Sequence, residues 1–387
     1  MSEVRVEFFD TTLRDGAQSL PAANQFREGA KPEIAELIAN LHGGVIEAGF
    51  PRTPGDEIEV SEVAKTVGNT PYLVQNWQDG QIVDTSYVTP TIAGLCRTRE
   101  EDIDPAWSAV QYAQRPRIHT FVSTDPEHMA AKFPDKTPKQ VLRMGQHAVR
   151  YARDIMQDNP LATVEFSAEA ASTTDNKYLE RVIKTAIDEG ADIINLPDTV
   201  GQRDPFWMRK FYARAIKWAM QTNPEVAISA HNHNDIDMAT VNSLALVFAA
   251  ADYAAKHDTT VNIQLETTIC GLGERAGNAD VFPVAEGLFK FSESMPATVN
   301  WHFNPARSVA TAKRVLSMGG MQVDRQSPIV GEDINTHRSG IHSDGVIKGG
   351  HGIYTPHDPT FWGHATDARH EEGRYQGAKG RAAALAA

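Results

Sequence analysis

Short β-rich runs alternate with amphipathic helical stretches along most of this chain, and that alternation limits the possible folds more than any other feature. Eight runs of apolar or β-branched residues predict strands at 4–10, 43–50, 91–95, 117–123, 162–168, 192–198, 226–233 and 261–268. Helical patterns lie between them, as at 31–41, 138–156 and 176–190. Eight strand–helix units in about 280 residues predict an α/β fold, a (β/α)8 TIM barrel, with a doubly wound open sheet as the alternative.

Two segments depart from the alternation. Residues 71–90 contain a turn-like Gln-Asp-Gly between two apolar pieces, which predicts a hairpin inserted before the third strand. After about residue 295 the pattern changes: 305–321 is helical, and 327–364 is rich in Gly, His and Asp with little periodicity. We therefore expect a catalytic barrel over 1–295 and a helical and irregular linker region over 296–387.

The net charge and the number of cysteines indicate which partners and which cellular compartment to expect for this protein. The net charge of −13 argues against non-specific binding to nucleic acid or to an anionic membrane surface. No run approaches ~18 apolar residues, and the N-terminus does not resemble a signal peptide, so no membrane association is expected. Cys96 and Cys270 both lie in strand-like apolar runs, which favours two buried thiols in the cytoplasm over a disulfide.

The predicted barrel carries polar residues where its strands end, and active sites of such barrels lie at the carboxyl ends of the strands. Arg14 and Asp15 follow the first strand, and Glu47 ends the second. The later strands bring His119, Glu165, Ser167, Glu169, Asn195, Asp198 and Thr199.

The seventh strand ends in His-Asn-His-Asn, residues 231–234. Residues i and i+2 of a strand point to the same face, so His231 and His233 would both face the barrel mouth, with Asn232 and Asn234 turned away. Two imidazoles and a carboxylate, for which Asp15 is a natural candidate, make a divalent-metal site with open positions. Such a mixed set suits Mn²⁺, Mg²⁺ or Zn²⁺, whereas the alternative is a pair of exposed loop histidines.

Two further segments contain residues that could bind a ligand or transfer a proton. The glycine-dense loop 270–278 follows a strand and contains Arg275, so it either approaches an anionic ligand or forms an ordinary strand-to-helix turn. Outside the barrel, His337, His342, Asp344 and Tyr354 are either surface residues or candidates for proton transfer.

Taken together, the motifs resemble those of the metal-dependent enzymes that condense acyl-CoA with 2-oxoacids, a family that contains the 2-isopropylmalate, homocitrate and citramalate synthases. The matching segments are DTTLRDGAQS, RIHTFVSTDPEHMAAK, VEFSAEAASTTD, INLPDTVG, HNHND, GLGERAGNAD and INTHRSGIHSDGVIK, in this order over nearly the whole chain. Three of them, IHTFVSTDPEHMAAK, VEFSAEAAS and NLPDTVG, are most similar to the 2-isopropylmalate synthase segments.

The resemblance implies roles for individual residues. It implies a metal held by Asp15, His231, His233 and Asn278, and a 2-oxoacid held by Arg14, His119, Ser167, Pro197 and Thr199. Acetyl-CoA, the co-substrate, would meet Gly271, Gly273, Glu274, Arg275 and Gly277. Arg14, Glu169, His342 and Tyr354 match catalytic positions. In the family the last two come from the partner subunit's linker, so a homodimer is implied.

The implied reaction is a transferase reaction in which acetyl-CoA and 3-methyl-2-oxobutanoate give 2-isopropylmalate and CoA, early in leucine biosynthesis. The same chemistry on 2-oxoglutarate or pyruvate, a carbon–carbon lyase, and a non-catalytic binding protein are the alternatives. The chain has Ala17 where the family usually has glutamate. It also stops at residue 387, where typical 2-isopropylmalate synthases continue into a leucine-binding domain, so we expect no such domain and no feedback by leucine.

Overall fold

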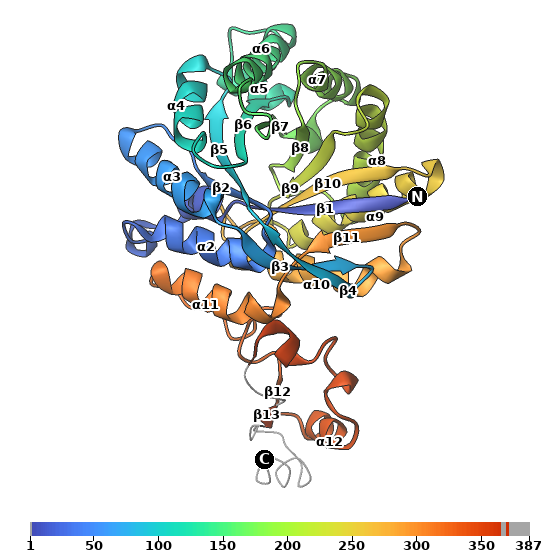
Figure 1. The fold of residues 1–387 in the computed structure, drawn as a ribbon. Coiled ribbons are helices and arrows are strands. Elements are labelled where there is room, and N and C mark those ends of the chain that lie inside the picture. Colours follow the sequence, from blue (N-terminus) through green and yellow to red (C-terminus); the bar gives the residue numbers. More distant parts are fainter. Residues whose placement is uncertain (1, 365–368, 371–387) are drawn as a thin grey trace. The chain divides into compact units, whose positions relative to one another are not determined.

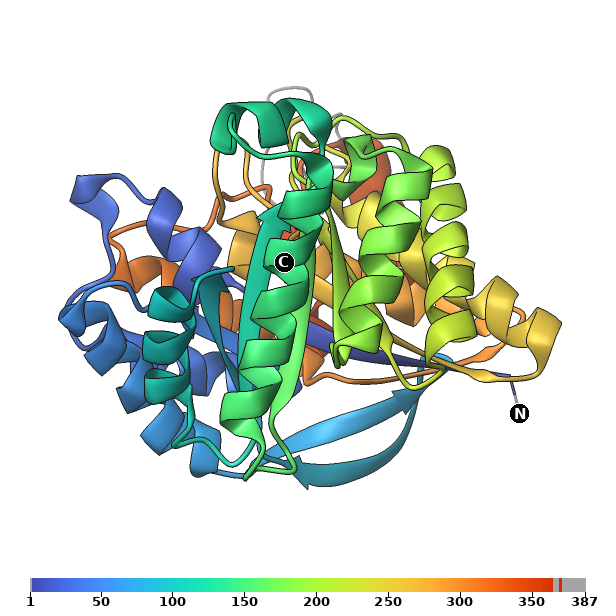
Figure 2. The ribbon, with the colours of Figure 1, turned by 90° about the horizontal axis from the view of Figure 1, so that it is seen from above.

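A computed structural model describes residues 2–364 and 369–370 of the chain. The backbone divides into two compact units, Met1–Phe303 and Asn304–Ala387. In the first unit, helices surround a sheet of mostly parallel strands (Figures 1 and 2).

The first unit is a closed barrel of eight parallel strands, which confirms the predicted fold. The strands are β1 (Glu3–Asp10), β2 (Val45–Gly49), β5 (Thr91–Arg97), β6 (Pro116–Ser123), β7 (Thr163–Glu169), β8 (Ile193–Asp198), β9 (Ala227–Asn232) and β10 (Thr260–Thr267). Each strand pairs with the next, and β10 pairs with β1 over eight residues. This last pairing closes the sheet, so the open doubly wound alternative is wrong.

Helices follow the barrel strands along the chain. They are α2 (Ala30–His42), α3 (Pro54–Thr66), α4 (Glu100–Val110), α6 (Pro138–Met156), α7 (Asn176–Asp188), α8 (Pro205–Thr222), α9 (Ala239–His257) and α10 (Val281–Phe291), with the shorter α5 (Pro126–Lys132) before α6. Their starts are encoded locally, because Thr53 and Thr137 form capping boxes with Asp56 and Gln140.

The predicted hairpin is present and extends the sheet. Strands β3 (Tyr72–Gln78) and β4 (Gln81–Val88) pair antiparallel, and β3 pairs antiparallel with β11 (Thr298–His302), which lies beside β1. The indole N–H of Trp77 donates to the carbonyl of Phe303 at 2.8 Å. The first unit therefore runs eight residues past the boundary expected at 295, because β11 joins the sheet.

The second unit contains α11 (Ser308–Met318) and α12 (Gly340–Gly349), joined by irregular segments. Its two short strands, β12 (Thr336–His337) and β13 (Arg369–His370), pair in parallel. The helix expected at 305–321 is thus present in a shorter form, and one helix lies within the stretch expected to be irregular. Residues 365–368 and 371–387 of the predicted linker region lie outside the described residues.

The expectation of two strand thiols is half right. Cys96 is buried in β5. Cys270 is not in a strand: it is partly exposed in a 3-10 turn, Ile269–Gly271, with a left-handed backbone (φ 53°). The chain must turn sharply after β10 to form the glycine loop described below, and this ends the strand before Cys270.

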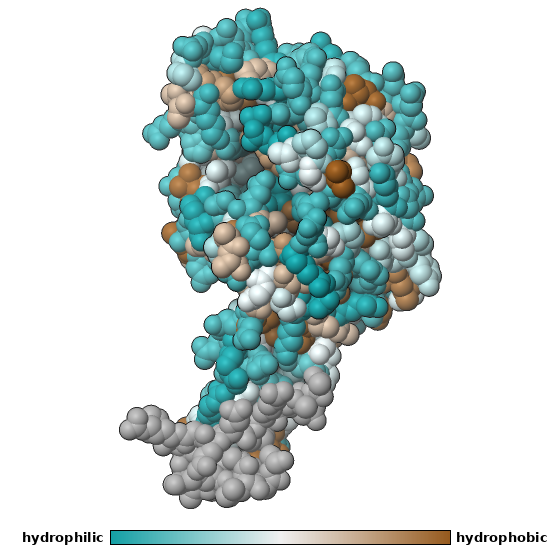
Figure 3. All heavy atoms as spheres, turned by 90° about the vertical axis from the view of Figure 1, so that its left-hand side faces the viewer, coloured by the Kyte–Doolittle hydropathy of each residue, from teal (hydrophilic) through white to brown (hydrophobic). Residues whose placement is uncertain are grey.

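Hydrophilic residues predominate on the face shown in Figure 3, with apolar side chains scattered among them. Among the described helices, none is both long and apolar enough to cross a membrane.

Candidate active site

A cavity of about 250 Å³ opens at the carboxyl ends of the barrel strands. Its wall contains all five residues expected to bind the 2-oxoacid and three of the four expected to bind metal. The lining residues are Arg14, Asp15, Gln18, Phe50, Leu95, His119, Phe121, Ser167, Glu169, Asn195, Pro197, Thr199, His231 and His233. These side chains meet because parallel strands of a barrel end at the same rim.

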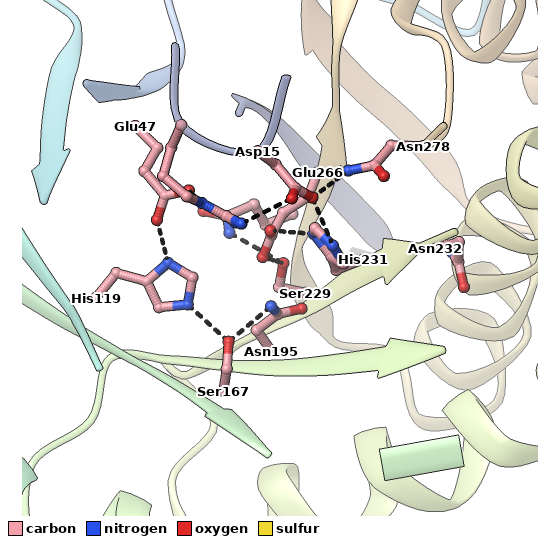
Figure 4. Close-up of polar contacts among 12 residues, drawn as sticks. Asp15, Glu47, His119, Ser167, Asn195, Ser229, His231, Asn232, Glu266 and Asn278 are labelled. Atoms are coloured by element: carbon pink, nitrogen blue, oxygen red, sulfur yellow. Dashed lines mark hydrogen bonds and ion pairs between the residues drawn. The ribbon is translucent and has the colours of Figure 1, made fainter. Parts of the chain in front are cut away.

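Asp15, His231 and His233 form a compact set of potential metal ligands. Their ligand atoms all lie within 4.8 Å of one another, and all three residues are buried. The Nδ2 of Asn278 donates to the Asp15 carboxylate at 2.5 Å. As expected from the alternation of strand residues, Asn232 points away from this group (Figure 4), where its amide donates to Ser243.

Unpartnered atoms at this point indicate that the set fits a cation. Nδ1 of His233 and Oδ1 of Asn278 are buried and have no hydrogen-bond partner among the described residues. Buried polar atoms are rarely left without a partner in proteins. A divalent cation that accepts nitrogen and oxygen ligands, such as Mn²⁺, Mg²⁺ or Zn²⁺, suits the side chains of Asp15, His231, His233 and Asn278.

The charges around the set also favour a cation. Burial would raise the pKa of Asp15, but Arg14 and the two histidines hold that pKa well below its usual range. Burial, together with the neighbouring His231, lowers the pKa of His233 to about 3, so its imidazole is neutral. Burial also opposes charge on His231, but Glu266 and Asp15 outweigh this and raise its pKa to about 10. A proton and a metal ion therefore compete for His231.

Glu266, at the end of β10, orients His231. Its Oε2 lies 2.7 Å from Nδ1 of His231, which leaves Nε2 facing Asp15 at 3.4 Å (Figure 4). A carboxylate behind a metal-binding histidine fixes the ring and its tautomer. Glu266 was not singled out in the sequence, although a carboxylate near the end of a predicted barrel strand was a usable signal.

A second chain of contacts leads from Arg14 across the cavity. The Nε of Arg14 donates to Glu47 at 2.5 Å, and Nη1 lies 3.1 Å from Asp15. The other oxygen of Glu47 contacts Nδ1 of His119 at 2.6 Å. The Nε2 of His119 contacts Ser167 at 2.6 Å, and Asn195 donates to the same hydroxyl at 2.8 Å. Glu47 and Asn195 were singled out in the sequence only as polar strand ends, without a role.

A second group of potential ligands, His119, Glu165 and Glu266, also lies within 4.8 Å. Every one of these side chains already contacts protein partners, with His119 on Glu47 and Ser167, and Glu165 on Arg117 and Gln264. Burial would lower the pKa of His119, but the carboxylates Glu165 and Glu47 raise it. This group is a hydrogen-bond network, in contrast to the first set with its open atoms.

Glu169, one of the expected catalytic residues, lines the cavity at the end of β7. Its two carboxylate oxygens are both occupied, one by the hydroxyl of Ser123 and the other by Nζ of Lys132 at 2.5 Å. Each contact occupies one of the lone-pair sites of its oxygen and holds the carboxylate in place.

The glycine loop after β10 surrounds Asn278. A Cβ on Gly273 would lie 2.3 Å from Oδ1 of Asn278, and a Cβ on Gly277 would lie 2.2 Å from the carbonyl of Gly271. Glycine is therefore needed at these positions because a side chain would prevent the backbone from packing closely around Asn278, a candidate metal ligand. Arg275 pairs with Asp235 through two contacts of 2.8 Å. Contact of Gly271, Gly273, Glu274, Arg275 and Gly277 with acetyl-CoA stays a prediction.

The remaining two expected catalytic residues, His342 and Tyr354, lie in the second unit. Their rings stack with centroids 4.1 Å apart and planes 12° apart, and the ring of His337 is 5.8 Å from each. The pair that the sequence singled out is thus brought together, while its part in the barrel cavity stays a prediction.

The chain matches one protein family over most of its length and is similar to several named enzymes. Residues 5–289 match the model of a family described as HMGL-like. The chain is 37% identical to "2-isopropylmalate synthase 2, chloroplastic" of Arabidopsis thaliana over 344 residues, 89% of this chain and 50% of that protein. It is 38% identical to the 2-isopropylmalate synthases of Pelotomaculum thermopropionicum and Pyrococcus furiosus, again over 89% of this chain but 60% and 61% of theirs. The chain thus spans about half to three fifths of the length of these relatives.

Solved structures share the fold at low sequence identity. An HMG-CoA lyase from Brucella melitensis superposes with a TM-score of 0.57 at 15% identity, covering 82% of this chain and 99% of that one. The carboxyl transferase domain of Rhizobium etli pyruvate carboxylase superposes with a TM-score of 0.52 at 17% identity, covering 84% and 49%. At such identities the likeness concerns the fold alone.

Proposed function

The chain belongs to the HMGL-like family, and from that premise we propose that it condenses acetyl-CoA with 3-methyl-2-oxobutanoate to give 2-isopropylmalate and free CoA. One observation carries the proposal: a candidate metal set and Arg14 share a cavity with an apolar part, in a chain 35–38% identical to several 2-isopropylmalate synthases. The reaction consumes one water, which hydrolyses the thioester.

The cavity has a polar and an apolar part, which match the two ends of the proposed acceptor. Phe50, Leu95, Phe121 and Pro197 supply the apolar part. A branched aliphatic side chain would be buried there at a gain of about 25 cal/mol per Å² of apolar surface removed from water. Among the lining residues, Arg14 is the only arginine or lysine, so a second carboxylate on the acceptor would lack a cation of its own.

Asp15, His231, His233 and Asn278 would hold the divalent cation. When bound, such an ion acts as a Lewis acid that polarises the keto group of a 2-oxoacid. Arg14 donates to the keto oxygen as negative charge develops there, and Glu47 holds the guanidinium in place through Nε. His119 and Ser167, already linked at 2.6 Å, offer hydrogen bonds to the acceptor carboxylate.

A proton must leave the methyl group of acetyl-CoA before the new carbon–carbon bond forms. We assign this step to a relay through His342 and Tyr354, with Glu169 as the second candidate because both of its oxygens are engaged. Since the relay residues lie in the second unit, we propose that the enzyme works as a homodimer in which the linker of one subunit completes the barrel site of the other. We place the reaction in the cytoplasm.

A second cavity, of about 500 Å³, offers room for the longer co-substrate. It shares Arg14, Gln18 and Phe50 with the first cavity and is also lined by the cations Arg27, Lys31 and Arg52. Lys31 pairs with Glu59 at 2.8 Å, whereas Arg52 stacks on Phe50 at 5.5 Å. We propose that the pantetheine arm passes Gln18 and that the phosphates of CoA lie near these cations.

The test is release of CoA from acetyl-CoA, followed with a thiol reagent. Purified protein is assayed with 3-methyl-2-oxobutanoate, 2-oxoglutarate and pyruvate in parallel, each with and without a chelator. Release that requires the branched acid and stops with chelator supports the proposal. Release with another acid alone refutes the proposed acceptor but keeps the metal mechanism, and no release with any acid refutes both.

A further inference from the structure

A column of buried polar side chains runs through the interior of the barrel, where other barrels of this type are packed with apolar residues. It consists of Arg117, Glu165, Gln264, Ser229 and Glu266, which we call the axial column. Each of the five is at most 3% exposed. They come from β6, β7, β9 and β10, so the column links two pairs of adjacent strands, β6 with β7 and β9 with β10.

The axial column spans the barrel from one face to the other. Arg117 lines a cavity of about 460 Å³ at the amino ends of the strands, where Nη2 also meets Glu7 at 3.4 Å. At the other end, Glu266 contacts His231, which lines the active-site cavity (Figure 4). Arg117 itself does not line that cavity.

The hydrogen bonds of the column have a fixed direction. Arginine can only donate, and Nη1 of Arg117 donates to Oε1 of Gln264 at 2.6 Å. The amide nitrogen of Gln264 must then face the other way, where it donates to Glu165 at 2.8 Å and to Ser229 at 2.9 Å. The hydroxyl of Ser229 in turn donates to Oε1 of Glu266 at 3.1 Å.

This direction reaches the candidate metal ligand. With Oε1 of Glu266 held by Ser229, Oε2 is directed at Nδ1 of His231, 2.7 Å away. The ring then donates from Nδ1 and keeps the lone pair of Nε2 for the metal position beside Asp15. If the Gln264 amide turned over, its oxygen would face Ser229, the hydroxyl would donate to it instead, and Glu266 would lose one of its two anchors.

We propose that Arg117 is a positioning residue for the metal site. It acts from the opposite face of the barrel. Together with Glu165, which it contacts and which accepts from the amide nitrogen, Arg117 fixes the orientation of the Gln264 amide and through it Ser229, Glu266 and finally the ring of His231. This inference rests on the metal site of the proposed function, and it adds a residue remote from the active-site cavity to that site.

The experiment measures Mn²⁺ affinity by calorimetry and the symmetry of bound Mn²⁺ by electron paramagnetic resonance, on the full chain without substrates. Arg117→Met keeps an apolar stem of similar length and removes every donor. We expect the Kd for Mn²⁺ to rise by about 10- to 100-fold, the range typical of groups that support a metal ligand. Arg117→Lys, which retains a cationic donor, should recover part of the affinity.

Thr163 provides a matched control, because it accepts from Nε of Arg117 at 2.9 Å but lies outside the relay to Gln264. Thr163→Val removes a partly buried contact of the same arginine and should leave the Kd for Mn²⁺ within about twofold of the parent. A Gln264→Met variant breaks the relay one step further on and should raise the Kd as Arg117→Met does. The double variant should be no weaker than either single variant, as expected for two residues on one path.

The outcomes separate this inference from the proposed function. Parent protein that binds no Mn²⁺ refutes the metal site and, with it, this inference. Parent protein that binds Mn²⁺, with Arg117→Met and Gln264→Met binding equally well, refutes the inference alone, even where both variants unfold at lower temperature. If Arg117→Met does not fold, the comparison of Arg117→Lys and Gln264→Met with Thr163→Val decides the same question.

Discussion

Charged side chains can be buried inside this barrel because they lie beside groups of opposite charge. Arg14 lies between Glu47 and Asp15, and His231 lies between Glu266 and Asp15. An unpaired ion at such a depth would cost several kcal/mol. At the candidate metal set, Nδ1 of His233 and Oδ1 of Asn278 have no partner among the described residues, and they mark the place where we propose that a cation completes the site.

The first prediction concerns Asp15. Asp15→Asn keeps the size of the side chain but removes the negative charge from the metal set, so the Kd for Mn²⁺ should rise by at least about 100-fold. Asp235→Asn is the matched control, because Asp235 pairs with Arg275 near the same rim but is not among the grouped ligands. Titration calorimetry measures both. Equal affinity of the two variants would contradict the proposed ligand.

The second prediction concerns Asp10, which is fully buried at the end of β1. One oxygen accepts from the backbone of Thr12 at 2.8 Å, and the other has no partner among the described residues. Burial raises the pKa of Asp10 to about 7. A folded state that holds the proton more tightly than the unfolded chain loses stability as the pH rises from about 4 to about 7.

Asp10→Asn cannot titrate and should be free of that loss. Between pH 5 and pH 8 its free energy of unfolding should therefore improve by about 2 to 3 kcal/mol relative to the parent protein. Urea unfolding at the two pH values, with metal chelated throughout, measures the difference. A constant gap between the two proteins across this range would show that Asp10 is ionised in the fold.

At the scale of elements, the junction between α2 and β2 depends on close approach of two backbones. Gly43 ends α2 in the left-handed conformation, with φ 63°, and a Cβ on Gly44 would lie 2.2 Å from the carbonyl oxygen of Phe8 in β1. That oxygen belongs to a barrel strand and cannot move aside without disturbing the sheet. The glycines let β2 lie directly beside β1, which brings Glu47 to the site.

The third prediction follows from this contact. Gly44→Ala should lower the free energy of unfolding by about 2 kcal/mol or more, as overpacking against a fixed group does. Gly55, near the start of α3, has only Thr53 near the position of a Cβ, at 3.8 Å. Gly55→Ala should therefore stabilise by about 0.4 to 1 kcal/mol. Chemical denaturation of both variants tests the pair, and destabilisation by Gly55→Ala alone would contradict it.

At the scale of the whole molecule, the candidate catalytic groups are divided between the two units. The metal set and Arg14 lie in the first unit, whereas His342 and Tyr354 lie in the second. The proposed homodimer, in which each subunit completes the site of its partner, turns this division into a testable property of the assembly.

The fourth prediction is that two inactive variants restore activity when mixed. Asp15→Asn lacks a working barrel site and His342→Ala lacks a working linker, but a hybrid dimer holds one site in which both are intact. Random exchange of subunits should give about a quarter of the parent CoA release, because half of the dimers are hybrids with one working site each. Each variant mixed with itself is the control. A mixture that stays inactive after proven subunit exchange would contradict the shared site.

Much of the fold was predictable because it is encoded in local patterns. The eight barrel strands, the hairpin before β5 and α11 follow from the spacing of apolar residues and from turn signals. The residues that line the cavity could be predicted for a topological reason, because in a closed parallel barrel the polar strand ends share one rim. The strand at Thr298–His302 was missed, since its short run pairs with β1 and β3 far away in sequence.

The sequence by itself determined the barrel and the set of side chains at its mouth, because period and strand position are local properties of a chain. The tertiary structure alone decided how those side chains are supported. Glu266 behind His231, both oxygens of Glu169 occupied, and Arg117 linked through Gln264 to the metal set each depend on contacts between strands distant in sequence. Whether a buried polar group has a partner depends on ångström-scale distances in the folded state, and no local pattern carries that information.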